Sequence, residues 1–141
     1  MMILFPNVNM AVCDWIRDNL PSGEKWSEAL VTPVWSDQEL AKVDWAVVVR
    51  NDGGQDSSVI SQNVSLGVTC MGPRRDTEDD EIACERLAQT VAAIIRDCAR
   101  PGDVNPFAGC TDMNGPYPIP SENGRPAYYL TADVEVVAAV S

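Results

Sequence analysis

The stretch Asp52-Gly53-Gly54 is the first place where residue types and spacing could support chemistry. A glycine-rich turn is typical of phosphate-binding loops when a strand precedes it and a helix follows it. The residues after Gly54 instead come to alternate between apolar and polar types, which predicts a strand. The Lys-Ser/Thr pair of a Walker-type loop is missing as well. The two glycines are therefore interpreted as the tip of a β-hairpin, and no cofactor is expected.

Carboxylates are the second candidate chemistry. The densest cluster comprises Asp76, Glu78, Asp79, Asp80 and Glu81. Carboxylate oxygens can hold Mg²⁺, but acidic residues at a helix start are also explained by the positive end of the helix dipole. The chain contains no histidine, the commonest general base and a member of every Ser-His-Asp arrangement. We expect no metal site and no catalytic residue, and keep a small carboxylate-based enzyme or ligand-binding module as an alternative.

The cysteines predict packing and not catalysis. There are five, with no Cys-x-x-Cys pair, and the odd number favours free thiols in a reducing cytoplasm over a disulfide framework. Cys84 lies near a predicted helix start, where a thiol can become a nucleophile. We interpret Cys84 as a core residue.

Length and charge limit the classes of function. A chain of 141 residues with 45% hydrophobic residues indicates one domain, 1–141. No stretch approaches the roughly 18 apolar residues of a membrane span, and Met1–Phe5 lacks the basic region of a signal peptide. The net charge of −11 argues against tight nucleic-acid binding, because that binding needs Lys and Arg at the phosphates. The same charge also serves solubility.

Periodicity predicts two helices and at least four strands. Helical spacing of apolar residues appears near residues 8–18, with Asn7 or Asn9 as cap, and again over 78–98, with Thr77 as cap and Pro101-Gly102 as the end. Strands are expected over 30–34, at an edge because of Pro33, and over 43–50, 60–70 and 128–136. Residues 101–126 are expected to form a long loop containing one short strand, and Asn123-Gly124 to form a tight turn.

This order of elements predicts the α+β class. Two strong strands flank Asn51–Ser57, and Gly53-Gly54 would supply the positive φ angles of the turn between them. We expect a mainly antiparallel four- to five-stranded sheet, with two helices packed on one face and a protruding β-hairpin.

The candidate interaction residues fall in two groups. The hairpin tip comprises Asn51, Asp52, Gly53, Gly54, Gln55 and Asp56, although Asp52 and Asp56 are also ordinary turn formers. Trp26 and Trp35 flank a short segment and are predicted interface anchors, since Trp is enriched at interface hot spots. Trp15 falls on an apolar helix face and is assigned to the core.

The chain resembles the tail terminator proteins of long-tailed bacteriophages, in the form found among phages of actinobacteria. The resemblance spans most of the chain. It is carried by 49–54 (VRNDGG), 64–68 (VSLGV), the Ala/Leu/Val/Ile helix 82–98, 115–120 (GPYPIP) and 129–136 (YLTADVEV). The segment 26–42, rich in tryptophan, and the polar segment 107–113 depart from the expected pattern.

The resemblance implies a structural virion protein and not an enzyme. Such proteins form a hexameric ring that caps the tail tube, ends its polymerisation and joins the tail to the head, and the DNA later passes through the ring. The implied partners are further copies of the chain, the tail tube protein and a neck or head-completion protein, with no membrane. The implied location is the tail or neck of the virion, after assembly in the host cytoplasm. Another head–tail joining protein of the neck is the alternative.

Overall fold

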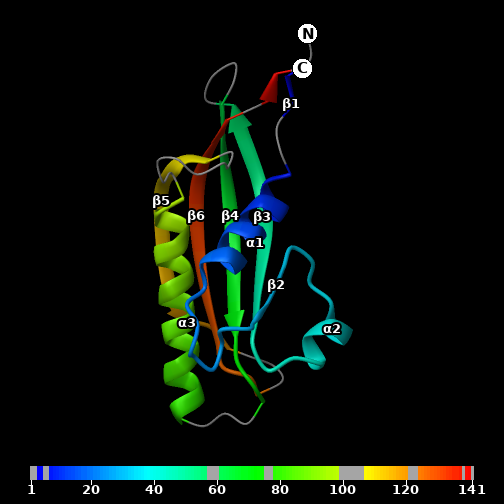
Figure 1. Cartoon of the computed structure of the whole chain (residues 1–141), viewed down its shortest axis with the longest axis vertical. Coiled ribbons are helices and arrows are strands. Elements are labelled where there is room, and N and C mark those ends of the chain that lie inside the picture. The colour runs from blue at the N-terminus through cyan, green and yellow to red at the C-terminus, as the bar shows by residue number, and fades with distance from the viewer. Residues whose placement is uncertain are drawn as a thin grey trace.

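The computed structural model describes residues 3–4, 7–56, 61–74, 78–98, 107–120, 124–137 and 139–140. Five strands form one mixed sheet in the order β2-β3-β4-β6-β5 (Figure 1). In that order they are Leu30–Thr32, Ala46–Asp56, Ser61–Met71, Ala127–Val137 and Phe107–Pro118. The helices are α1 (Val8–Asn19), α2 (Asp37–Ala41) and α3 (Glu78–Arg96). The fold class is α+β, as expected.

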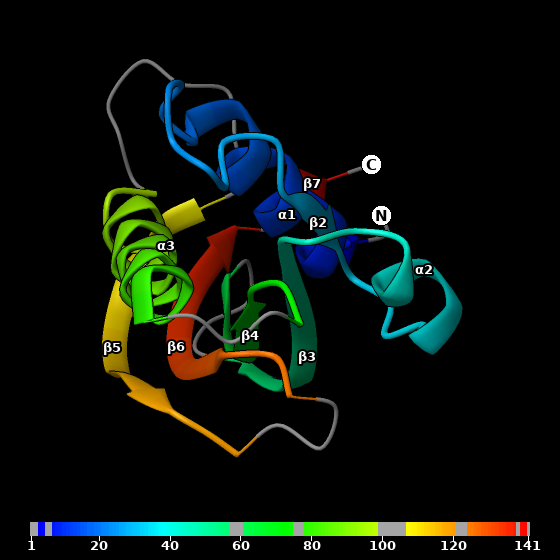
Figure 2. The same ribbon diagram turned by 90° about the horizontal axis from the view of Figure 1, so that it is seen from below.

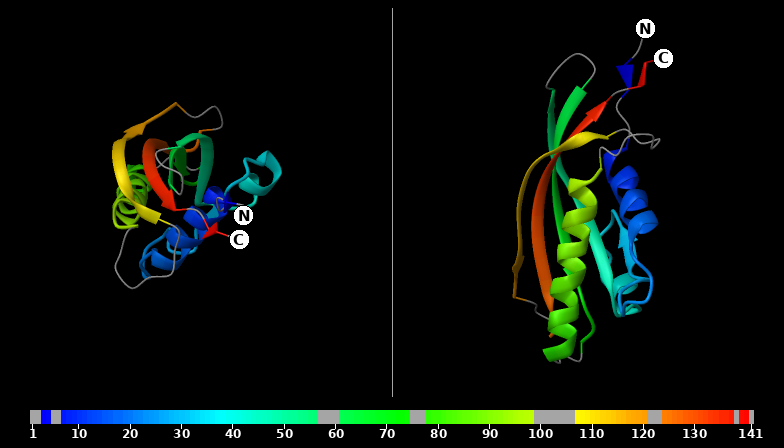
Figure 3. Two further views of the ribbon diagram at one scale, coloured as in Figure 1. Left: turned by 90° about the horizontal axis from the view of Figure 1, so that it is seen from above. Right: turned by 60° about the vertical axis from the view of Figure 1, so that its left-hand side comes forward.

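The core lies between one face of the sheet and two helices. Figure 3 shows α1 and α3 on the same side of the sheet, as the sequence predicted. Apolar residues of both helices pack there against alternate residues of the strands, among them Val47, Val49, Val64, Leu66, Val68, Leu130, Ala132 and Val134. A second, smaller cluster on the other face contains Leu40 of α2 with Ala46, Val48, Met71 and Ala127. Because β3 is buried on both faces near its start, its sequence there is apolar without alternation.

The first helix follows its sequence pattern closely. Val8, Val12 and Ile16 are buried, and the Asn7 side chain caps the helix by accepting from the Met10 amide at 3.2 Å. Trp15 is partly buried, and its indole N–H donates to the carbonyl of Ile94 on α3 at 2.9 Å. This bond fixes the two helices to each other at the end of α3.

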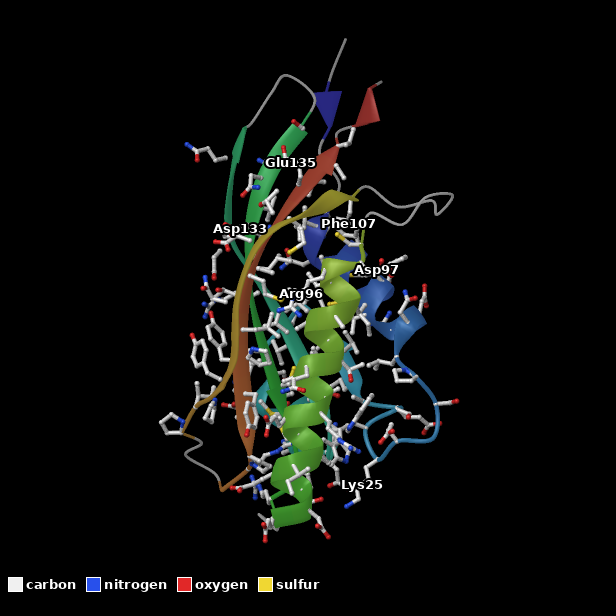
Figure 4. The ribbon with its side chains drawn as sticks, turned by 90° about the vertical axis from the view of Figure 1, so that its left-hand side faces the viewer. Lys25, Arg96, Asp97, Phe107, Asp133 and Glu135 are labelled. Carbon is white, nitrogen blue, oxygen red and sulfur yellow. The ribbon has the colours of Figure 1, made fainter. Side chains whose placement is uncertain are left out.

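The longest helix packs through the predicted apolar stripe. Its buried residues include Cys84, Leu87, Val91 and Ile95. Lys25, from the loop after α1, forms an ion pair with Asp80 in the first turn of α3 at 3.6 Å (Figure 4). The predicted cap Thr77, the acidic residue Asp76 and the predicted helix end at Pro101-Gly102 lie outside the described residues.

The sheet is mainly antiparallel, as predicted, because three of its four strand pairs are antiparallel. The edge strand β2 differs from the others, since it runs parallel to β3. A parallel pair needs a crossover connection, and α2, a third helix, lies in that connection. The Ser36 side chain caps α2 by accepting from the Glu39 amide at 3.3 Å. A Ser-x-x-Glu spacing at 36–39 signals a helix start, but the helix is too short to show periodicity.

The expected long loop over 101–126 is wrong for much of its length. Residues Phe107–Pro118 form β5, a twelve-residue edge strand paired with β6. Its register shifts at three places, so inward and outward residues do not alternate strictly. The irregular pattern and the prolines hid the strand, since an edge strand tolerates both. The predicted closing strand β6 is central, with β4 and β5 on its two sides.

The two ends of the chain meet in a small separate sheet. β1 (Ile3–Leu4) pairs antiparallel with β7 (Ala139–Val140). This sheet lies at the end of the molecule where β3 and β4 extend past α1 and α3 (Figure 1). The opposite end holds the start of α3.

Candidate interaction surfaces

The predicted hairpin tip is part of the paired strands. β3 and β4 are antiparallel, and Gly54, Gln55 and Asp56 of β3 pair with Val64, Asn63 and Gln62 of β4. Residues 57–60, between the two strands in the sequence, lie outside the described residues. The placement of Gly53-Gly54 at the turn was therefore wrong, and the hairpin is longer than expected. The described residues from Asn51 to Gln55 are exposed.

Gly53 serves a β-bulge instead of a turn. The register between β3 and β4 shifts between Asn51 and Gly53, and Gly53 has a φ of +114°. The Asn51 side-chain oxygen accepts from the Gly53 amide at 2.8 Å. The positive φ expected at Gly53 is present because a bulge, like a turn, uses backbone conformations that favour glycine. The positive φ expected at Gly54 is not, and this part of the prediction is wrong.

A side-chain bridge crosses three strands beside the bulge. The Arg50 guanidinium on β3 donates to both carboxylate oxygens of Asp52 and, at 2.9 Å, to the Tyr129 hydroxyl on β6. Hydrogen bonding to Asp52 is the main cause that raises the pKa of Arg50 above its usual value. Gly67 of β4 lies beneath the bridge, where an added Cβ would be 2.5 Å from the Tyr129 hydroxyl. A larger residue at position 67 would displace the Tyr129 side chain.

The face of the sheet that carries Arg50 and Tyr129 lies opposite α1 and α3. Toward the hairpin end this face is polar. Ser65 donates to Asp133 at 2.7 Å, and Asn63 donates to Glu135 at 3.1 Å and to Thr111 at 3.0 Å. Asp133 and Glu135 extend from β6 on the side away from α3 (Figure 4). These cross-strand bonds hold β4, β6 and β5 in register on the face of the sheet opposite α1 and α3.

A groove occupies the other end of this face. Its main cavity of about 610 Å³ has Leu40, Met71, Ile119 and Ala127 among its apolar lining. Trp35 forms a wall shared with a second cavity of about 200 Å³, which reaches Arg50 and Tyr129. The Trp35 side chain is 56% exposed, and its indole N–H donates to Asp37 at 2.9 Å. The position of Trp35 suits the predicted role as an interface anchor.

Trp26 does not share that position, and this corrects the expectation that both tryptophans are surface anchors. Its side chain is only 2% exposed and belongs to the main core. Its indole nitrogen is buried and has no hydrogen-bond partner in the described part of the structure. Trp26 therefore holds the loop after α1 against the core.

Arg125 is a buried residue that the sequence did not single out. Its side chain is 5% exposed, and its guanidinium donates to the carbonyls of Gly72, Leu40, Val43 and Asp44. Burial is the main cause that lowers its pKa below the usual value. Arg125 thereby joins the segment after α2, the end of β4 and the start of β6 under the groove. Only tertiary structure brings these carbonyls together.

The cysteines are free thiols, four of them buried and Cys110 partly exposed. Burial raises the pKa of Cys13 to about 11, of Cys84 to about 12 and of Cys98 to about 11. A raised pKa keeps a thiol protonated at neutral pH and lowers its reactivity. Cys84 therefore packs in the core, as interpreted from the sequence.

Within the described ranges, no group of three or more His, Cys, Asp or Glu side chains is arranged to hold a metal ion. Among the helices of the described part, none has the length and apolarity to cross a membrane.

Comparison with known proteins adds no assignment. A scan against models of known protein families finds no match, and a search of curated proteins finds no similar sequence.

Proposed function

We propose that this chain is a structural protein of a phage virion that forms a ring on the tail tube, ends tube polymerisation and joins the tail to the neck. It acts without catalytic residues, metal or cofactor. Its partners are further copies of itself, most simply six in a ring, together with the tail tube protein and a neck protein. DNA passes through the ring without binding tightly.

The observation that carries the proposal is the β3–β4 hairpin. Both strands are eleven residues long, and their far end extends past α1 and α3 (Figure 1). Asn51 to Gln55 on β3 are exposed, although Val64, which pairs with Gly54 from β4, belongs to the core. An exposed polar segment of an extended hairpin suits contact with another subunit or the next ring.

The segments that carry the sequence resemblance lie next to one another in the fold. The segments that carry the resemblance fall on β3, β4, α3, β6 and the end of β5. The strands among them are neighbours in the sheet, and α3 packs against β4, β5 and β6. The resemblance thus covers elements that pack against one another.

The net charge of −11 suits a subunit that surrounds DNA. Six copies would carry a charge of about −66. DNA gains affinity when Lys and Arg replace the counterions on its phosphates, and a surface poor in these residues offers little of that gain. An acidic ring would let DNA slide without adhesion.

Light scattering coupled to size exclusion tests the proposal, with the chain alone and mixed with the tail tube protein of the same source. A particle near six subunits, alone or only with the tube protein, would support it. A monomer indifferent to the tube protein would instead favour another head–tail joining role in the neck.

A further inference from the structure

Two of the five cysteines lie where the end of α3 meets the start of β5. Cys98 follows α3, and its amide donates to the carbonyl of Ile95 at 3.2 Å, which closes the last turn. Cys110 lies on β5. α3 covers the face of the sheet over β5 and β6 (Figure 2), and its end is beside the start of β5 (Figure 3). The two thiols therefore come from elements that pack against each other.

The strand register directs the Cys110 side chain toward α3. Cys110 is paired with Val134 of β6, and Phe107 is paired with Val136. Cross-strand partners project from the same face of a sheet, and Val134, Val136 and Phe107 all belong to the main core beneath the helices. Cys98 is a member of this core, and Cys110 packs against it. Both sulfur atoms therefore lie on the same side of the sheet.

The Cys110 thiol also acts on Cys98 electrostatically. Burial is the main cause that raises the pKa of Cys98 to about 11, and the next cause is Cys110. Because the interaction of two charges weakens with distance, this influence agrees with neighbouring sulfur atoms. Burial is also the main cause that raises the pKa of Cys110, while the Arg96 guanidinium opposes the rise. A nearby cation favours the thiolate, which is the form that attacks a disulfide.

Access from solution distinguishes this pair from the other cysteines. Cys13, Cys70 and Cys84 are 0% exposed and Cys98 is 2% exposed, whereas Cys110 is partly exposed. Cys70 and Cys84 also lie close together, with the Cys84 sulfur 3.5 Å from the Cys70 carbonyl oxygen, yet neither reaches the surface. A reagent in solution can therefore reach Cys110 first, and Cys98 only through Cys110.

We propose that Cys98 and Cys110 are a redox-active pair, which a low-molecular-weight disulfide such as oxidised glutathione converts into a disulfide bond. In the first step the Cys110 thiolate attacks one sulfur of the reagent, releases one thiol and forms a mixed disulfide. In the second step Cys98 loses its proton, and its sulfur attacks the Cys110 sulfur and releases the second thiol. The two cysteines lose two electrons and two protons in total, and these reduce the reagent to two thiols.

The bond would fasten the end of α3 to an edge strand. β5 pairs only with β6 among the described strands, and its register shifts at three places. A cross-link closes a short loop and removes entropy from the unfolded chain, which stabilises the folded one. The weak hydrogen bond from the Cys110 thiol to the Asp112 carbonyl, at 3.3 Å, would be lost in exchange. Reducing conditions keep both cysteines as thiols, and an oxidising medium forms the bond.

Reaction of the folded protein with oxidised glutathione in mildly alkaline buffer tests the inference. The remaining thiols are alkylated, and the chain is then digested without reduction by Asp-N, which cleaves before Asp103 and so separates the two cysteines. Mass spectrometry identifies the joined peptides. Cys98→Ser and Cys110→Ser remove one partner each, and Cys84→Ala is the matched control from the other close pair. Circular dichroism checks that each variant is folded.

We expect the wild type to lose two of its five thiols and to contain one disulfide, between the peptides of Cys98 and Cys110. Its melting temperature should rise by about 5 °C and return to the starting value after reduction with dithiothreitol. Cys98→Ser should keep one glutathione on Cys110, because no second thiol displaces it. Cys110→Ser should remain unmodified, and Cys84→Ala should oxidise like the wild type.

The wild type alone can overturn the inference, so the test does not depend on the folding of any variant. Five thiols remaining after exposure would overturn it, and so would a disulfide that joins other cysteines or two chains. A glutathione that stays on Cys110 in the wild type would show that Cys98 does not reach it, with the same consequence. An unchanged melting temperature after oxidation would contradict the stabilising tether. The inference goes beyond the proposed ring, and none of these outcomes depends on the tail tube protein.

Discussion

Arg50 and Tyr129 are 79 residues apart in sequence, and their side chains meet at 2.9 Å across the intervening strand β4. The contact is possible because Gly67, between them, has no side chain. The bridge ties β3 to β6 beside the bulge, at the base of the part of the hairpin that extends beyond the helices. It separates the polar end of the sheet from the Trp35 groove.

Substitution of Gly67 should uncouple this bridge. In Gly67→Ala the new methyl group would meet the Tyr129 hydroxyl, which can move away because it ends a flexible side chain. We expect Tyr129→Phe to cost about 0.5–1 kcal/mol of unfolding free energy in the wild type and close to zero in Gly67→Ala. Urea unfolding of the four proteins in this cycle gives the coupling. Equal costs of Tyr129→Phe in both backgrounds would show that the contribution of the Tyr129 hydroxyl does not depend on Gly67, against this prediction.

Arg125 should be the most sensitive charged residue for stability. Arg125→Lys cannot reproduce the planar set of donors, and it would leave several of the four buried carbonyls unsatisfied. We expect a loss of about 3 kcal/mol in urea unfolding, against less than about 0.5 kcal/mol for Arg86→Lys on the exposed face of α3. A loss at Arg125 no larger than at Arg86 would contradict its role as a structural centre.

Stability should fall in mildly alkaline solution because of the buried thiols. The folded-state pKa of Cys13 is about 11, whereas an unfolded thiol ionises near pH 8.5. Its contribution is therefore complete below about pH 8.5 and is lost as the pH rises toward 11. Urea unfolding at pH 7.5 and 10 measures the loss of unfolding free energy, and Cys13→Ala should make that loss smaller by roughly 2 kcal/mol. An unchanged loss in Cys13→Ala would contradict this assignment.

Shortening the hairpin should impair assembly more than folding. Deletion of Gln55 and Asp56 together with their partners Asn63 and Gln62 removes two pairs and preserves the register of the remaining β3–β4 pairs. It also removes the pairs of Asn63 and Gln62 with Glu135 and Val136 of β6, so we expect a folded protein whose melting temperature falls by several degrees, which circular dichroism checks. Binding to the tail tube protein should be lost. A variant that is folded and binds normally would exclude the hairpin as a contact element.

Local patterns predicted the elements that bury one regular face. α1, α3, β4 and β6 each follow a helical or alternating pattern, and the two helices lie on one side of the sheet as expected. The elements that local pattern could not predict are those whose form depends on partners distant in sequence. β2 is parallel because of where α2 places the chain, and β5 is held by β6 despite its irregular sequence.

The candidate surfaces were predicted less completely. Trp35 is exposed as an anchor must be, whereas Trp26 is buried, and nothing in their immediate neighbours distinguishes the two. Gly67 was an available signal, because a glycine within a strand often marks the close approach of another group. Two sets of contacts could not be predicted from sequence spacing, because they depend on the strand order. They are the hydrogen bond between Arg50 and Tyr129 and the bonds from Arg125 to its four carbonyls.

The most direct test of the central claim is the length of tail tubes assembled in vitro from the tail tube protein, imaged by electron microscopy with and without this chain. The proposed function predicts shorter tubes of limited length, with a ring of the chain at one end. Tubes of unchanged length, with no copies of the chain at their ends, would contradict it.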